Sequence, residues 1–298
     1  MSLLVLLGVS ILTFLMIHLV PGDPVVAMAG RQAVSAETIE ELREELGLND
    51  PLPVQYWNYV SQVVQGDLGQ SIRSKRPVTE AIAEQLPSTI QLTFTAIIIA
   101  SVLGIGMGIL AAINRNTWFD TLTMTVAISG VSIPHFWLGL LLVLLFSVKL
   151  GWLPAVAPSD DPLGLILPAI TLAAGEAAVI TRLVRVSMID VMDKGYLLAA
   201  RAKGVRENRV ILHHALRNAL IPVITVIGLQ VGFMLAGSIV VESIFARQGL
   251  GRLAITAINN RDLPLIQGVV LVTASIYVLV NTLTDVLYVF LDPRIRLN

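Results

Sequence analysis

Long stretches without a charged side chain constrain this chain more than any other feature of its sequence. No Asp, Glu, Lys or Arg lies between Glu84 and Arg115. Uncharged intervals of the same kind are found at 2–22, 121–148, 218–241 and 263–284, and the apolar interval 163–181 carries one charge, Glu176. A helix of about 20 apolar residues crosses the roughly 30 Å hydrocarbon core of a bilayer. The sequence therefore predicts an all-α integral membrane protein with six transmembrane helices.

Composition agrees with a membrane protein and excludes several kinds of chemistry. Hydrophobic residues make up 55% of the chain and charged residues only 14%, which is unlike a soluble domain. Without cysteine, the chain has no disulfide, thiol nucleophile or thiolate metal site. No Gly-Lys dipeptide occurs, so a phosphate-binding P-loop is missing. We therefore expect no catalytic, cofactor or metal site, and His213 and His214 diverge by about 100° on a helix.

The polar interval 182–217 has a one-sided charge. Its eight basic residues face only Asp190, Asp193 and Glu207, and a basic excess beside a membrane span marks a cytoplasmic segment. The pattern predicts one helix over about 187–202, a turn at Gly204 that needs positive φ, and a second helix from about Glu207. Two helices joined by such a turn form a compact elbow, which suits the transmission of force to a partner.

The segment 21–87 is predicted to lie outside the cell, because its acidic residues outnumber its basic ones. Two amphipathic helices are expected in it, one after Ser35 and one over 55–65, the second with Tyr56, Trp57 and Tyr59 suited to a membrane interface. The preceding segment 1–20 is expected to be the first transmembrane helix. A cleaved signal peptide is the alternative, but the basic region that precedes such peptides is missing.

Small and kinking residues inside the spans predict how the helices pack. Gly104 and Gly108, four residues apart, indicate a close helix–helix contact rather than a nucleotide loop. Pro134 is expected to kink the third span. Ser132 and His135 beside it could suggest an intramembrane hydrolase, but no second activating group is found, so a packed kink is favoured.

Polar side chains within the spans are candidates for the lining of a translocation path. A carboxylate in the bilayer costs roughly 2.5 to 3.5 kcal/mol, so Glu176 should face the bundle or water. The alternative to a role in the path is a structural one, in which Glu176 forms an ion pair with Arg182, about 9 Å away along the helix. The candidate path residues are Ser132, Glu176, Gln230 and Asn281.

Residues Leu198 to Gly204, LAARAKG, resemble the EAA-type loop through which the permeases of ABC importers dock on their ATPases. With HALRNALIPV at 214–223, the segment is similar to the permease family for dipeptides, oligopeptides, glutathione and nickel. Leu198 stands where the general motif has Glu, and Arg217 stands where it has a later proline. Strings such as GDLGQSIRSKRPV and GSIVVESIF also resemble family segments outside the membrane.

This resemblance implies a type I ABC importer permease fold with a helical extracytoplasmic insertion between helices 1 and 2. It implies a transmembrane core at 88–291 and a short cytoplasmic tail at 292–298, with both termini in the cytosol of a bacterium or archaeon. The coupling loop covers about 182–217. The residues expected to contact the ATPase are Ala199, Ala200, Arg201, Ala202, Lys203, Gly204 and Glu207.

The resemblance also implies the partners. They are a second homologous permease, two subunits that bind ATP and Mg²⁺, an extracytoplasmic substrate-binding protein and membrane lipid, with no nucleic acid. The insertion at 21–87 serves either as a lid on the bundle or as a contact for the binding protein. Di- and oligopeptides, with glutathione among them, are the favoured substrates, and nickel or a nickel chelate is the alternative. The alternative functions from other classes are a secondary transporter, a channel and an intramembrane enzyme. Each of these would work without an ATPase.

Overall fold

The computed structural model of this protein describes residues 2–19, 40, 43, 49–158 and 161–291. Regular structure in this part of the chain is helical, apart from one isolated β-bridge between Gln70 and Pro77. The helix predicted after Ser35 and the tail at 292–298 lie outside these residues, except for Glu40 and Arg43.

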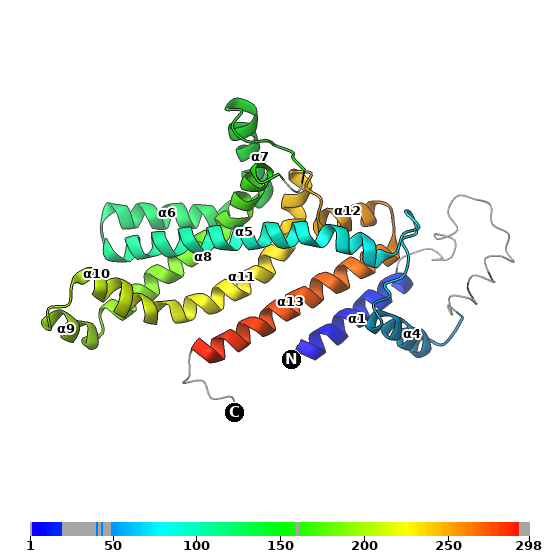
Figure 1. The fold of residues 1–298 in the computed structure, drawn as a ribbon, viewed down its shortest axis with the longest axis horizontal. Coiled ribbons are helices and arrows are strands. Elements are labelled where there is room, and N and C mark those ends of the chain that lie inside the picture. Colours follow the sequence, from blue (N-terminus) through cyan, green and yellow to red (C-terminus); the bar gives the residue numbers. More distant parts are fainter. Residues whose placement is uncertain (1, 20–39, 41–42, 44–48, 159–160, 292–298) are drawn as a thin grey trace. The chain divides into compact units, whose positions relative to one another are not determined.

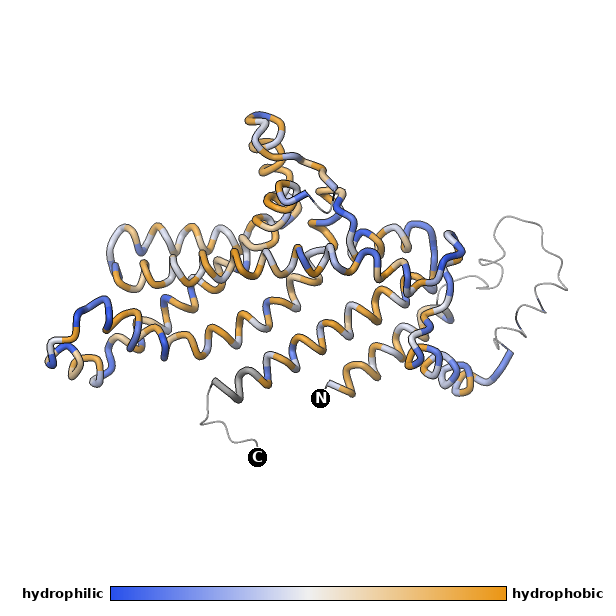
Figure 2. The backbone as a smooth tube through the Cα atoms, viewed as in Figure 1, coloured by the Kyte–Doolittle hydropathy of each residue, from blue (hydrophilic) through white to orange (hydrophobic). Residues whose placement is uncertain are grey.

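Four helices in the described part are long and apolar enough to cross a membrane. They are α5 (Val78–Ile113), α8 (Leu163–Met192), a continuous run of α10 (Glu207–Arg209), η2 (Val210–Ala215) and α11 (Leu216–Ile244), and α13 (Leu263–Leu291). Figure 2 shows that apolar residues dominate along them, whereas the segment around α9 (Gly195–Ala202) is hydrophilic. The all-helical membrane class is thereby confirmed.

A fifth span is counted if a bent helix pair is taken as one. This pair consists of α6 (Trp118–Ser132) and α7 (His135–Leu142) with its π-helical continuation η1 (Val143–Lys149). The two halves meet at 106°, and Figure 1 shows α7 directed away from the axis of α6. The apolar helix α1 (Ser2–Leu19) is shorter than the spans.

The bend corrects the prediction of a simple kink at Pro134. Ile133 is extended, with φ −82° and ψ 120°, because the ring of a following proline disfavours the helical region for the residue before it. The ring nitrogen Nδ1 of His135 lies 3.2 Å from the carbonyl oxygen of Thr171 and donates to it. The helix therefore ends before the proline and a new one begins after it.

Two further predictions of helix bounds were wrong. The helix expected over 187–202 is divided at Asp193 and Lys194 between the end of α8 and the start of α9. Pro87 is expected near the start of the second span, where a proline suits a helix, but α5 begins at Val78 and contains Pro87 in its interior.

The chain divides into two compact units. Unit 1 consists of Met1–Pro87 with Arg252–Val278, and unit 2 of Ser88–Gly251 with Leu279–Asn298. Within unit 1, α4 (Leu52–Val64) packs on α1: the hydroxyl of Tyr56 lies 2.8 Å from that of Ser10, and the hydroxyl of Tyr59 lies 3.1 Å from that of Thr13. Burial raises the pKa of Tyr59. Of the aromatic side chains predicted for an interface, only Trp57 is largely exposed.

Unit 2 contains a core in which α5 packs closely on α8. A Cβ atom at Gly104 would lie 2.7 Å from Ile180, and one at Gly108 would lie 2.6 Å from Val184. Both are far below van der Waals contact, so only glycine allows this approach of the two backbones. The predicted small-residue contact is thereby confirmed. Helix α6 lies beside α5 (Figure 1), and Gly130 of α6 faces Ala178 of α8.

Candidate functional site

The turn after α9 has the hydrogen bonds of a glycine-terminated helix end. Gly204 has φ +78°, its amide donates to the Arg201 carbonyl at 2.9 Å, and the Val205 amide donates to the Ala200 carbonyl at 3.2 Å. This pair of bonds is a Schellman motif, whose left-handed residue is usually glycine. The positive φ predicted for Gly204 is confirmed.

An ion pair spans this turn. The guanidinium of Arg201 donates to the carboxylate of Glu207 at 2.8 Å through Nη2 and at 3.1 Å through Nε. The hydrogen bond to Glu207 raises the pKa of Arg201. Both side chains are partly exposed, so the pair fixes the direction of the turn more than it stabilises the fold.

One face of α9 is anchored and the other is exposed. Leu197 is fully buried in the core of unit 2, and the amide of Asn218 donates to the hydroxyl of Tyr196 at 3.0 Å. On the other side Leu198 is 62% exposed, next to exposed Ala199, Ala202 and Lys203. An apolar patch with basic neighbours on a rigid short helix can bind a protein surface.

A largely buried ion pair that no sequence pattern indicated joins α6 and α8. Nε and Nη2 of Arg185 donate to the two carboxylate oxygens of Asp120 at 2.5 and 2.6 Å. A second, exposed pair joins Arg115 to Asp193 at 3.2 Å. The sequence offers one hint, because Asp120 is a lone acidic residue directly before the apolar interval 121–148. However, 65 positions separate Asp120 from Arg185, so no local pattern pairs them.

The four candidate path residues lie on different helices of unit 2. Ser132 is exposed and donates to the Ile128 carbonyl of its own helix. Glu176 is half-buried on α8, and Gln230 is buried on α11. The side-chain oxygen of Asn281 on α13 is buried without a hydrogen-bond partner. Among the described residues no hydrogen bond or ion pair joins any two of the four, and Glu176 forms no ion pair with Arg182.

Another buried carboxylate holds the turn after α11. Glu242 is fully buried, accepts from the hydroxyl of Thr89 at 2.6 Å and accepts from the amide of Gly251 at 2.8 Å. The Thr89 hydroxyl in turn accepts from the Leu250 amide at 2.8 Å. This network fixes the start of α12 (Leu250–Asn259). Desolvation lowers the pKa of the neighbouring Arg247, although the charge of Glu242 opposes that shift.

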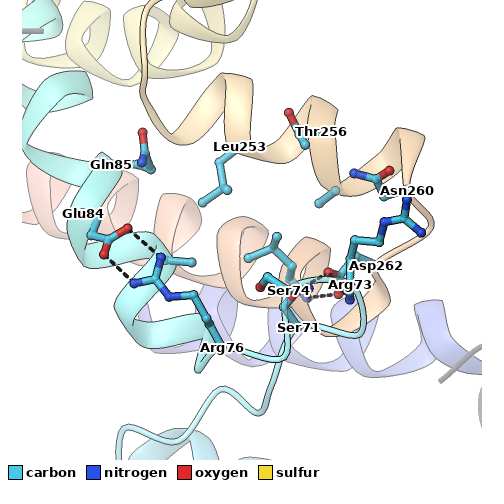
Figure 3. Close-up of a pocket in the computed structure, with 13 residues that line it drawn as sticks. Ser71, Arg73, Ser74, Arg76, Glu84, Gln85, Leu253, Thr256, Asn260 and Asp262 are labelled. Atoms are coloured by element: carbon cyan, nitrogen blue, oxygen red, sulfur yellow. Dashed lines mark hydrogen bonds and ion pairs between the residues drawn. The ribbon is translucent and has the colours of Figure 1, made fainter. Parts of the chain in front are cut away.

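Unit 1 contains a cavity of about 240 Å³ between the 71–76 loop, the start of α5 and α12. Figure 3 shows the side chains that line it. Asp262 anchors the loop, because its carboxylate accepts from the Ser71 hydroxyl at 2.5 Å and from the Ile72 amide at 3.1 Å. Arg76 is paired with Glu84, which raises the pKa of Arg76. The exposed residue Arg73 also lines this cavity.

Within the part of the chain that the structure describes, no three His, Asp or Glu side chains form a group that could hold a metal ion. The rings of His213 and His214 are nearly perpendicular, with centroids 5.2 Å apart.

Comparison with solved structures identifies the fold. The methionine ABC transporter MetNI, solved in inward-facing conformations, matches with a TM-score of 0.60 and 17% identity over 71% of this chain and 96% of that chain. An amino acid ABC transporter crystallised with histidines matches with a TM-score of 0.53 and 20% identity over 73% of this chain and 95% of that one. The fold is that of an ABC importer permease.

Sequence comparisons cover almost the whole chain. Residues 104–297 match the family "binding-protein-dependent transport system inner membrane component", and residues 1–93 match its N-terminal counterpart. The glutathione transport system permease protein GsiC of Escherichia coli K12 is 49% identical over 97% of this chain and 94% of its own length. That of Pectobacterium atrosepticum is 50% identical over 98% and 94%. This chain belongs to the family of inner-membrane permease components of binding-protein-dependent, ATP-driven importers.

Proposed function

We propose that this chain and a second, homologous permease form the path by which glutathione or related short peptides enter a bacterial or archaeal cell. The observation that carries the proposal is the near full-length similarity, at 49 to 50% identity, to permeases named for glutathione transport. Few charged groups lie in the spans, which favours a permissive peptide path over a high-affinity nickel site.

The arrangement in the membrane follows from charge. Counting α1 and the bent pair α6–α7 as spans gives six helices. The basic segment that contains α9 then lies in the cytosol, together with both termini. The acidic segment 21–87 lies outside. An inner-membrane location supports this arrangement without fixing its direction.

Two ATPase subunits supply the energy, and one of them binds the exposed face of α9. Leu198 and Ala202 form the apolar centre of this contact, and Lys203 lies at its basic edge. The Schellman turn and the Arg201–Glu207 pair keep the contact rigid. ATP biases the transporter toward its outward-open state because it binds that state more tightly.

On the other side of the membrane, the 71–76 loop of unit 1 contacts a substrate-binding protein. The hydrogen bonds from Ser71 and Ile72 to Asp262 hold this loop in one conformation. Binding therefore does not have to order the loop first. With Arg76 already paired to Glu84, Arg73 is the group that can bind a carboxylate of the partner.

Uptake by the reconstituted complex tests the proposal. The chain is purified with the second permease and the ATPases of its own transport system, placed in proteoliposomes, and given its binding protein with labelled glutathione. We expect uptake that requires ATP and the binding protein and that unlabelled short peptides inhibit. Uptake of nickel but not of glutathione would assign the other cargo, and uptake without ATP would reject an ATP-driven importer.

A further inference from the structure

The Asp120–Arg185 pair joins a side chain of α6 to a side chain of α8. Its two parallel hydrogen bonds, at 2.5 and 2.6 Å, fix the angle between the groups as well as their distance. The Asp120 side chain is 5% exposed and that of Arg185 is 22% exposed. Little water reaches the pair, so neither group can exchange its partner for solvent at low cost.

Asp120 also organises the turn in which α6 begins. Its carboxylate accepts from the amide of Asn116 at 3.0 Å, and Asn116 has a left-handed φ of +63°. The hydroxyl of Thr117 caps α6 by accepting from the Asp120 amide. A displacement of Arg185 therefore acts on the backbone at the start of α6 and not only on a mobile side chain.

The ion pair lies between α9, the proposed ATPase contact, and the bend at the end of α6. Arg185 is seven residues, about 10 Å, from the end of α8, and α9 follows after Asp193 and Lys194. At its other end α6 stops at the 106° bend. Elsewhere α6 and α8 meet through small residues such as Gly130 and Ala178, and contacts of that kind resist approach but allow sliding.

We infer that Asp120 and Arg185 are positioning residues that carry the movement of α9 to α6, and through α6 to the bend at Ile133 and Pro134. This inference rests on the proposed binding of an ATPase to α9. When the ATPase displaces α9, the end of α8 moves with it, and the ion pair makes the start of α6 follow. Without the pair, α8 slides along α6 and the bend stays where it is.

The ratio of ATP hydrolysed to glutathione taken up by the complete complex in proteoliposomes tests this role. For Arg185→Gln we expect that ratio to rise about fivefold or more, the usual lower range of coupling between sites, while ATP hydrolysis continues. Arg185→Lys keeps the charge but loses the two parallel hydrogen bonds. Its ratio should therefore lie between those of the wild-type chain and of Arg185→Gln. The matched control is Arg115→Gln, which removes the exposed pair to Asp193 at the same end of α8 and should leave the ratio unchanged.

A distance measurement separates transmission from simple stabilisation. The chain has no cysteine, so Lys194→Cys directly before α9 and Leu122→Cys on α6, both at exposed positions outside the proposed ATPase contact, give one pair of spin labels when the partners are cysteine-free. With the ion pair intact, adding ATP should leave the α9–α6 distance unchanged, because the two helices move together. With Arg185→Gln, ATP should shift or broaden that distance.

Three results would overturn the inference. They are a wild-type ratio in Arg185→Gln, an equal loss of hydrolysis and uptake, and an α9–α6 distance that ATP changes in the unmodified complex. If Arg185→Gln does not assemble, Arg185→Lys decides, and a wild-type ratio in it overturns the role. A wild-type complex without ATP-dependent uptake would instead reject the proposed function.

Discussion

At the scale of single residues, the turn after α9 depends on one backbone conformation. Gly204 has φ +78°, and a Cβ atom added there would meet nothing within 4 Å. Its requirement for glycine is therefore conformational and does not come from crowding. Gly195, at the start of α9, has equally open surroundings and no positive φ, so the two glycines differ only in backbone geometry.

Gly204→Val should uncouple ATP hydrolysis from uptake. A left-handed conformation costs a residue with Cβ roughly 1 to 2 kcal/mol, and more for a β-branched one, so the turn should relax and misdirect the exposed face of α9. We expect membrane insertion to be retained and uptake in proteoliposomes to fall several-fold. Gly195→Val is the matched control and should transport normally. Normal uptake by Gly204→Val would count against α9 as the ATPase contact.

Glu176→Gln should reduce transport more than stability. The carboxylate is half-buried in α8 and has no ion pair among the described residues, so the isosteric amide removes a charge without breaking a contact. We expect a lower rate of glutathione uptake and an unchanged Tm for the detergent-purified complex. A lower Tm with full uptake would instead assign Glu176 to the fold.

At the scale of elements, the packing of α5 on α8 depends on which glycines face the neighbouring helix. A Cβ at Gly108 would lie 2.8 Å from the carbonyl oxygen of Thr181, whereas one at Gly106 would meet nothing within 4 Å. Gly108→Leu should therefore destabilise the chain by about 1 to 3 kcal/mol through overpacking, and Gly106→Leu should not. Thermal unfolding of the two variants checks this, and equal Tm values would mean that the helices are further apart than described.

The sequence was informative about elements wherever the signal is local. Apolar intervals predicted the four long spans and the bent pair, although the count of six is not confirmed. The spacing of Gly104 and Gly108 predicted the close contact of α5 with a neighbouring helix, and the glycine after an Ala-rich helix predicted the turn at Gly204. The bend at Pro134 was underestimated, because a proline sets where a helix breaks while contacts such as that of His135 with Thr171 hold the new direction.

The ion pairs and carboxylate clamps of the site were not predictable in the same way. Asp262 and Ser71 are 191 positions apart, and Thr89 and Glu242 are 153 positions apart. Such pairs depend on how distant helices meet, which no periodicity records. Polarity alone indicated the candidate path residues, and no hydrogen bond or ion pair in the described part of the chain joins them.

At the scale of the whole molecule, the proposed function needs one surface for an ATPase and another for the substrate-binding protein. Arg73→Glu should weaken the stimulation of ATP hydrolysis by the binding protein, because of the two described arginines that line the cavity Arg76 is paired with Glu84, whereas no ion pair of Arg73 is seen. Arg261→Glu changes the same charge at an exposed neighbouring position that does not line the cavity. Titration of the binding protein against the reconstituted complex should show a lower apparent affinity for the first variant only. Equal affinities would place the contact elsewhere.

The central claim is that α9 lies in the cytosol and is covered by an ATPase. Because the chain has no cysteine, Ala202→Cys gives a single thiol on the exposed face of α9. The direct measurement is labelling of this thiol by a membrane-impermeant maleimide. The thiol should react in inside-out vesicles stripped of ATPase, stay unlabelled in intact cells, and become protected when the ATPase is added back. Labelling from outside intact cells, or no protection by the ATPase, would contradict the account.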